Sequence, residues 1–216
     1  MDNTVLLIAN ILTFVGSALT TIAALFKAKR RVLLFQSVNH ALEIAAQSMT
    51  QAYSGAVQEV IALIYGVVIL FVKSTKKAPK VIITALCLVA GVVLGVVINV
   101  LFSGNVWYGY LPIVAGAVYT FFVILAFFSD KDELKGDLLL KIGLIINVGC
   151  WATYGWFIRL YPVLGFNVAG FVFAAISIVR ILLAMKRRKN QSASPDGRAD
   201  LPSEAPRPDE KDPVEE

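Results

Sequence analysis

The sequence predicts an all-α, polytopic membrane helix bundle of seven transmembrane helices, and three observations support this fold class. Hydrophobic residues make up 57% of the 216-residue chain, charged residues only 16%, and the mean hydropathy is +0.72. Soluble domains are about half apolar and a quarter charged. The apolar residues fall into stretches of about 20 residues, the length that a helix needs to cross a bilayer. Basic clusters follow every second stretch, as expected for cytoplasmic loops.

The first expected helix, residues 4–26, follows the acidic Asp2 and is longer than the apolar core of a signal peptide. We therefore expect it to remain in the membrane. Six further stretches have the length and apolar character of transmembrane helices; they are 32–53, 55–73, 81–103, 106–128, 138–159 and 161–185. The second and third are the least apolar, since they contain Gln36, Asn39, His40, Glu43, Gln47, Gln58 and Glu59.

The distribution of basic residues predicts the orientation. Lys and Arg gather after the first, third, fifth and seventh stretches, at 27–31, 73–80, 131–135 and 186–189, whereas the alternate connections contain only Arg159. Because Lys and Arg accumulate in cytoplasmic loops, the N-terminus is expected outside and the C-terminus inside. The even alternation also supports a count of seven helices, because the loss of one would place a basic loop on the wrong side.

This orientation predicts an internal repeat in a 3+1+3 arrangement. Residues 4–73 and 106–185 would each form three helices that run in the same directions, with the helix 81–103 as the inverting connector of one transmembrane domain, residues 1–189. A single constant shift in residue number relates polar or turn positions of the two repeats; it places Asn39 on Asn147, Ser54 on Pro162 and Glu59 on Asn167. We therefore expect two parallel repeats.

Residues 190–216 differ in composition from the rest of the chain. They are rich in Pro, Ser and acidic residues and contain no aromatic residue. Such a segment cannot bury enough apolar surface to offset the entropy of the unfolded chain. We expect it to be a disordered, acidic, Pro-rich cytoplasmic tail.

Motifs near the end of the chain resemble a known superfamily. The segment "WATYG", residues 151–155, followed by Pro162 and "FNVAGFVFAAIS", resembles the SWEET, SemiSWEET and PQ-loop proteins. Over a longer span, "LLFQSVNHALEIAAQSMTQAYSGAV" and the helices after Leu111 resemble the YgjV-like family of bacterial inner-membrane proteins, a distant relative of that superfamily. SWEET transporters contain parallel repeats, with the substrate site near the midplane at the repeat interface. The resemblance implies a multi-pass protein of the bacterial plasma (inner) membrane.

The same resemblance implies a solute site. Trp151 would face a central cavity and stack on the apolar face of a solute, while the amide of Asn167 would donate and accept hydrogen bonds. Asn147 and Asn39 lie toward the cytoplasmic side of their helices and would form an inner pair of solute contacts, or would instead join helices by polar packing.

Two prolines stand where a helix could bend or begin. Pro112 lies within the expected helix 106–128, and the kink that it would cause is a candidate hinge for a gate, with the freed backbone groups satisfied by neighbouring helices. Pro162 would begin the last helix, where its missing N–H is harmless. We expect both prolines to belong to the hinge or gate.

Ionisable residues inside the expected helices are the candidates for proton or cation coupling. Gln36, His40, Glu43 and Gln47 are spaced by four, three and four residues, which places them on one helical face. A charge near a helix centre, as at Glu43, costs about 2.5–3.5 kcal/mol on insertion scales, and such residues mark ion or substrate paths. Glu43, Glu59 and His40 would carry the coupling, or would serve as hydrogen-bonded contacts between helices.

These features predict a carrier of a small polar solute, sugar-like or amino-acid-like, that works by alternating access. The alternative is a non-transporting membrane scaffold, receptor or assembly factor on the same fold. The partners expected are the solute and membrane lipids, the latter at the basic loops. The sequence is compatible with a monomer or a homo-oligomer.

Other functional classes find little support in the sequence. It contains no GxSxG, HExxH or glycine-rich phosphate loop, so no enzyme activity is expected. Cys87 and Cys150 lie among aliphatic residues, where a thiol behaves as a small apolar group, and no metal or cofactor is expected. The basic residues flank membrane helices as topology requires, so nucleic acid is not an expected partner.

Overall fold

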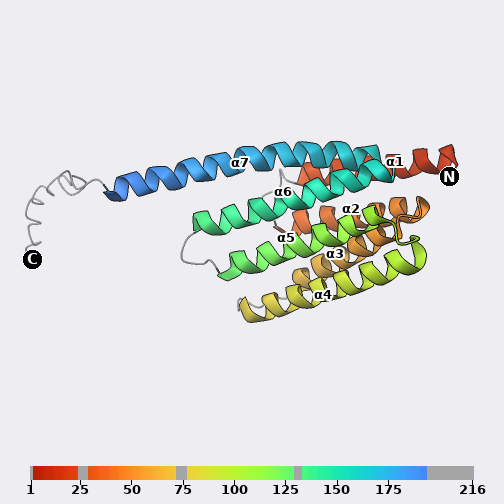
Figure 1. Ribbon diagram of the computed structural model, residues 1–216, viewed down its shortest axis with the longest axis horizontal. Helices are drawn as coiled ribbons and strands as arrows, with labels where there is room; N and C mark the ends of the chain where they lie inside the picture. The colour runs from red at the N-terminus through yellow and green to blue at the C-terminus, as the bar shows by residue number, and fades with distance from the viewer. Residues whose placement is uncertain (1, 24–28, 72–76, 129–132, 194–216) are drawn as a thin grey trace, which may run out of the picture.

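The computed structural model describes residues 2–23, 29–71, 77–128 and 133–193, and this part of the chain is helical without strands (Figure 1). The α-helices are α1 (Asn3–Ala23), α2 (Lys29–Met49), α3 (Tyr53–Phe71), α4 (Lys77–Phe102), α5 (Leu111–Phe128), α6 (Glu133–Phe157) and α7 (Tyr161–Ala193), and a 3-10 helix, η1 (Trp107–Tyr110), precedes α5. The seven helices predicted from the sequence are confirmed within these ranges.

Five of the described helices, α1, α4, α5, α6 and α7, are long and apolar enough to cross a membrane. The apolar part of α3 is shorter, Tyr53–Val68, and α2 contains the polar residues that made it the least apolar stretch of the sequence. Large apolar side chains are exposed along α4 and α7, including Leu86, Leu101 and Phe173. Exposed apolar surface of this extent fits a multi-pass membrane protein, whose outer face meets lipid.

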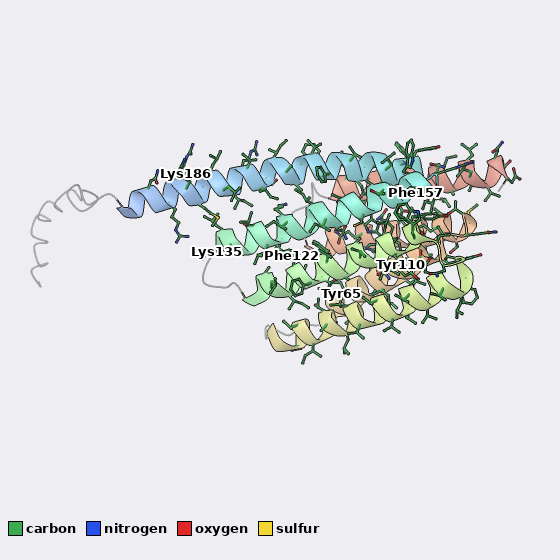
Figure 2. The ribbon with its side chains drawn as sticks, in the orientation of Figure 1. Tyr65, Tyr110, Phe122, Lys135, Phe157 and Lys186 are labelled. Atoms are coloured by element: carbon green, nitrogen blue, oxygen red, sulfur yellow. The ribbon has the colours of Figure 1, made fainter. Side chains whose placement is uncertain are left out.

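The helices form a closed ring with one helix outside it. In the ring, α1 contacts α2, α2 contacts α3, α3 contacts α5, α5 contacts α6, α6 contacts α7, and α7 returns to α1. Helix α4 packs on α3 and α5 from the outside, and Figure 1 shows it at the edge of the bundle opposite α1 and α7. Figure 2 shows Tyr110 and Phe157 at the end of the bundle near the N-terminus, with Lys135 and Lys186 toward the other end.

Element boundaries repeat at the spacing found in the sequence. Helices α1 and α5 begin at Asn3 and Leu111, α2 and α6 end at Met49 and Phe157, and α3 and α7 begin at Tyr53 and Tyr161. The separation in residue number is the same for all of these pairs, and it equals the shift that relates the polar positions of the two halves.

The turns α2–α3 and α6–α7 also share their backbone hydrogen bonds. In the first turn, the amide of Ala52 donates to the carbonyl of Gln47 (2.8 Å), and in the second the amide of Leu160 donates to the carbonyl of Gly155 (3.0 Å). The residue before each donor has a positive φ, 57° at Gln51 and 60° at Arg159. A left-handed residue after the last helical turn is a common way to end a helix, because it lets the next amides bond the free carbonyls.

Some boundaries differ from the sequence prediction. Helix α7 continues to Ala193, so residues 190–193, which were expected in the tail, are helical, and residues 194–216 lie outside the described residues. The expected helix 106–128 is divided into η1 and α5. Pro112 is therefore the second residue of α5 and not an interior kink, and Pro162 holds the same position in α7. Both prolines occupy first turns, where the missing N–H is not needed.

Candidate functional site

A cavity of about 460 Å³ lies among α2, α3, α4, α5 and α6. This volume falls within the range of about 300–1,000 Å³ that is typical of small-molecule sites. Its wall combines apolar residues with polar side chains from five helices; these are Gln36, Ser37, His40, Gln58, Glu59, Tyr65, Thr84, Tyr119, Thr120, Asn147 and Trp151. Figure 2 shows Tyr65 on α3 within this region of the bundle. The bundle therefore contains a small-molecule-sized space with polar groups around it.

His40 and Glu59 form an ion pair at the cavity wall. The Nδ1 atom of His40 lies 2.5 Å from Oε2 of Glu59, and their side chains are 25% and 12% exposed. Helix α2 contributes the imidazole and α3 the carboxylate, so the pair joins neighbouring helices of the ring. Partial exposure to the cavity leaves both groups within reach of a bound solute. The sequence pattern places His40 on the same helical face as Glu43, but in the structure His40 pairs with Glu59.

Gln58 is held where α3, α4 and α5 approach closely. Its Nε2 donates to the carbonyl of Gly91 on α4 at 2.7 Å. A Cβ atom added to Gly95 would lie 2.6 Å from Nε2 of Gln58, and one added to Gly116 would lie 3.0 Å from its Oε1. Three glycines therefore make room for one amide side chain, which fixes this side of the cavity.

The α5 and α6 walls supply aromatic, hydroxyl and amide groups. Tyr119 and Thr120 follow Gly116 by three and four residues, so they share one face of α5. On α6, the Nδ2 of Asn147 donates to the carbonyl of Ala115 at 3.2 Å, an arrangement that fixes the amide at the cavity wall. Trp151 also lines the cavity.

The cavity does not include every candidate from the sequence. His40, Glu59, Asn147, Trp151 and Pro112 line it. The other four candidates are not among its lining residues; they are Asn39, Glu43, Pro162 and Asn167.

Local contacts explain two of these placements. The Nδ2 of Asn167 donates to the carbonyl of Val163 one turn earlier in α7, at 2.8 Å, so that its donor group bonds its own helix. Asn39 packs against α1, where a Cβ atom added to Gly16 would lie 2.5 Å from its Oδ1. Asn39 and Asn147 therefore do not form an inner pair in the cavity.

Several cavity residues were not selected from the sequence. Tyr65, Thr84, Tyr119 and Thr120 are individually common in membrane helices, and none carries a charge. The available signal was spacing, because Gly116, Tyr119, Thr120 and Val123 follow the i, i+3, i+4, i+7 pattern of one helical face. That pattern shows which residues share one helical face, but it does not show whether this face contacts lipid, another helix or a cavity.

Tyr154 packs between the cavity wall and the end of the bundle that holds the α2–α3 and α6–α7 turns. Tyr154, which is 1% exposed, lies between Trp151 and these turns. Its hydroxyl donates to the carbonyl of Ala52 at 3.1 Å and accepts from the amide of Gly55 at 3.3 Å. The side chain from one half of the chain therefore satisfies backbone groups of the turn in the other half.

A second contact ties the other turn to α1. The Nδ2 of Asn10 donates to the carbonyl of Arg159 at 3.1 Å, and its Oδ1 accepts from the amide of Tyr161 at 3.0 Å. Leu160 between them is fully buried and belongs to the apolar cluster that includes Ala9 and Ala46. This end of the bundle is thus closed by polar contacts to both turns and by apolar packing.

The wall of the cavity has a distinct charge character. Among its described lining residues, Glu59 is the acidic group, His40 is its partner, and no Lys or Arg occurs. No group of three or more His, Cys, Asp or Glu suited to a metal ion occurs in the part of the chain that the structure describes.

Comparison of the chain with protein families, with curated proteins and with solved structures finds no match.

Proposed function

We propose that this protein is a membrane carrier that moves a small polar solute, sugar-like or amino-acid-like, by alternating access. The observation that carries the proposal is the 460 Å³ cavity with an ion pair, amides and hydroxyls on its wall, set among helices whose outer faces are apolar. Polar groups inside a membrane protein are costly unless they serve a path or a site. A solute with hydroxyl or amide groups would satisfy them.

The charge of the wall favours a neutral or cationic solute over an anionic one. An anion in the cavity would lie near Glu59, and among the described lining residues only His40 could offset its charge. Burial of an unpaired charge is strongly unfavourable. A neutral solute needs no such partner, and a cationic one would be attracted by Glu59.

The arrangement proposed for transport is a pair of parallel three-helix repeats joined by α4. The matched boundaries and the matched turns, all related by one shift in residue number, support it. With the N-terminus outside and the C-terminus inside, the turns closed by Tyr154 and Asn10 lie at the outer face. The cavity then lies on the cytoplasmic side of the closure, which corresponds to an inward-facing state. In the bacterial plasma membrane such a state would exchange solute with the cytoplasm.

Counterflow in proteoliposomes tests the proposal. A panel of labelled sugars, amino acids and organic cations should include one solute that exchanges saturably, and Asn147→Ala should lower its exchange at least 10-fold because the amide lies at the cavity wall. Asn167→Ala should have a smaller effect, since Asn167 is not among the residues that line the cavity. Ser177→Ala is the control for reconstitution, since this α7 hydroxyl donates to the carbonyl of Phe173 in its own helix and does not line the cavity.

Two results would count against this assignment. If folded protein exchanges no solute in a broad panel, the protein is not a carrier of these solute classes. If Asn167→Ala stops exchange and Asn147→Ala does not, the solute binds at the repeat interface suggested by the sequence and not in the cavity.

Thiol labelling gives a second test, because the two cysteines differ in position. Cys87 lines the cavity, whereas Cys150 is not among the lining residues. We expect a small maleimide to react with Cys87 in Cys150→Ser protein, and the transported solute to slow that reaction at least threefold by occupying the cavity. Labelling of Cys150 in Cys87→Ser protein should be insensitive to the solute. Equal protection of both thiols would indicate a global change in the protein and not occupation of the cavity.

A further inference from the structure

A second group of polar side chains is buried between α1 and α2, outside the cavity. Thr13 of α1 is fully buried, and Glu43 and Gln47 of α2 are 5% and 1% exposed. None of the three lines the cavity. The side chains of Thr13 and Gln47 both lie next to the Glu43 carboxylate. We refer to these three residues as the α1–α2 oxygen cluster.

Close packing of the two helices brings the cluster together. Gly16 of α1 leaves room for the side chain of Asn39, whose Oδ1 would lie 2.5 Å from an added Cβ atom. Thr13 precedes Gly16 by about one turn, and Glu43 follows Asn39 by about one turn on the neighbouring helix. The glycine contact thus places the threonine hydroxyl opposite the carboxylate.

The cluster contains several atoms without a hydrogen-bond partner in the described part of the protein. These are Oγ1 of Thr13, Oε2 of Glu43, and both Oε1 and Nε2 of Gln47. Buried polar atoms are nearly always paired with protein groups, water or a ligand. The oxygens of Thr13 and Glu43 are adjacent, and the amide of Gln47 beside them can present a third; this set points to a bound cation, since hard cations prefer oxygen ligands.

The charges around the cluster favour a monovalent cation. Glu43 has no ion-pair partner among the described residues, and it experiences the negative charge of Glu59. Glu59 is already paired with His40. One added positive charge would balance Glu43, whereas a divalent ion would leave a surplus charge in a buried site.

We propose that Thr13, Glu43 and Gln47 bind a monovalent cation, for which sodium serves as the probe, in a site separate from the cavity. The side-chain amide of Gln47 lies beside the Glu43 carboxylate, and exchange of its oxygen and nitrogen positions turns the oxygen to the ion without moving the side chain. The cation would join α1 to α2 close to Gly55 and Tyr154, which pack near Gln47. The site does not depend on the carrier function, because binding can be measured in the absence of any solute.

Thermal unfolding of the purified full-length protein tests the site. Sodium chloride should raise the unfolding temperature by several degrees, in a saturable way, relative to choline chloride at equal ionic strength, because a ligand of the folded state stabilises it. Glu43→Gln should abolish the sodium effect, since it removes the charge and keeps the shape. An equal effect of potassium would support the site with broader ion selectivity.

A threonine pair supplies a matched comparison in case Glu43→Gln does not fold. Thr13→Val should raise the sodium concentration for half the effect at least 10-fold, because it removes one oxygen ligand without changing side-chain shape. Thr20→Val should leave that concentration unchanged, since the Thr20 hydroxyl donates to the carbonyl of Gly16 at 3.3 Å and lies outside the cluster.

Three outcomes would overturn the site. The first is equal stability in sodium and choline. The second is stabilisation by protons alone, with no effect of sodium at any pH, which would identify Glu43 as a protonated contact between helices. The third is a larger effect of calcium or magnesium than of sodium. Absence of solute exchange in liposomes would leave the sodium result unaffected, so that failure of the carrier proposal and failure of the cation site are separate observations.

Discussion

Replacement of Gly55 by alanine is expected to destabilise the folded protein by about 1–3 kcal/mol, the range observed for overpacked cores. A Cβ atom at this position would lie 2.7 Å from Cε1 and 2.8 Å from the hydroxyl of Tyr154, and would also contact Oε1 of Gln47. Tyr154 and Gln47 are both almost fully buried, so neither can move away easily. The substitution would displace the tyrosine hydroxyl from Ala52 and open the closed end of the bundle.

A second glycine is the control for this prediction. A Cβ atom at Gly165 of α7 meets no atom within 4 Å, so Gly165→Ala should be neutral or slightly stabilising through higher helix propensity. At the position that corresponds to Gly55 in the second half, the chain has Val163, so the glycine is specific to the turn that receives Tyr154. Thermal unfolding in the same detergent would measure both variants. Equal stability of the two would show that Tyr154 does not pack tightly against Gly55.

The seven helices were predictable from the sequence, because long apolar stretches specify helices that can cross a membrane. The ends of helices were predicted less well. Helix α7 extends to Ala193, beyond the apolar stretch from which it was predicted. Because its last residues are polar, hydropathy cannot detect this extension. The 3-10 helix before α5 was not predicted, because Trp107 to Tyr110 are uncharged and run directly into the apolar residues of α5.

The candidate site was predictable only in part. Ionisable residues in apolar helices are conspicuous, so His40 and Glu59 were selected, but their pairing depends on the rotation of α2 against α3. Glu43 shares a helical face with His40 in the sequence pattern, yet it lies among α1 and α2 side chains outside the cavity. Its rotation follows from the packing of Gly16 against Asn39, which no single-helix pattern contains.

Substitutions in the His40–Glu59 pair are expected to have the second large effect, a loss of solute binding. Glu59→Gln should weaken binding of the transported solute by about 10- to 100-fold, because hydrogen bonds to charged groups contribute about 1.5–3 kcal/mol. His40→Gln should weaken binding to a similar degree. The imidazole and the carboxylate are in direct contact at 2.5 Å, so that each substitution also removes the partner of the other group.

A double-mutant cycle measured by equilibrium solute binding separates a shared role from two independent ones. If the pair binds solute as a unit, the double variant His40→Gln with Glu59→Gln should bind no more weakly than the worse single variant, because the second substitution removes a group that had already lost its partner. Gln36, which also lines the cavity on α2 but is not part of the pair, provides the comparison. Gln36→Ala combined with Glu59→Gln should give losses that add. Additive losses for His40 and Glu59 would show that each contacts the solute separately, and unchanged binding in both single variants would exclude the pair from the solute site.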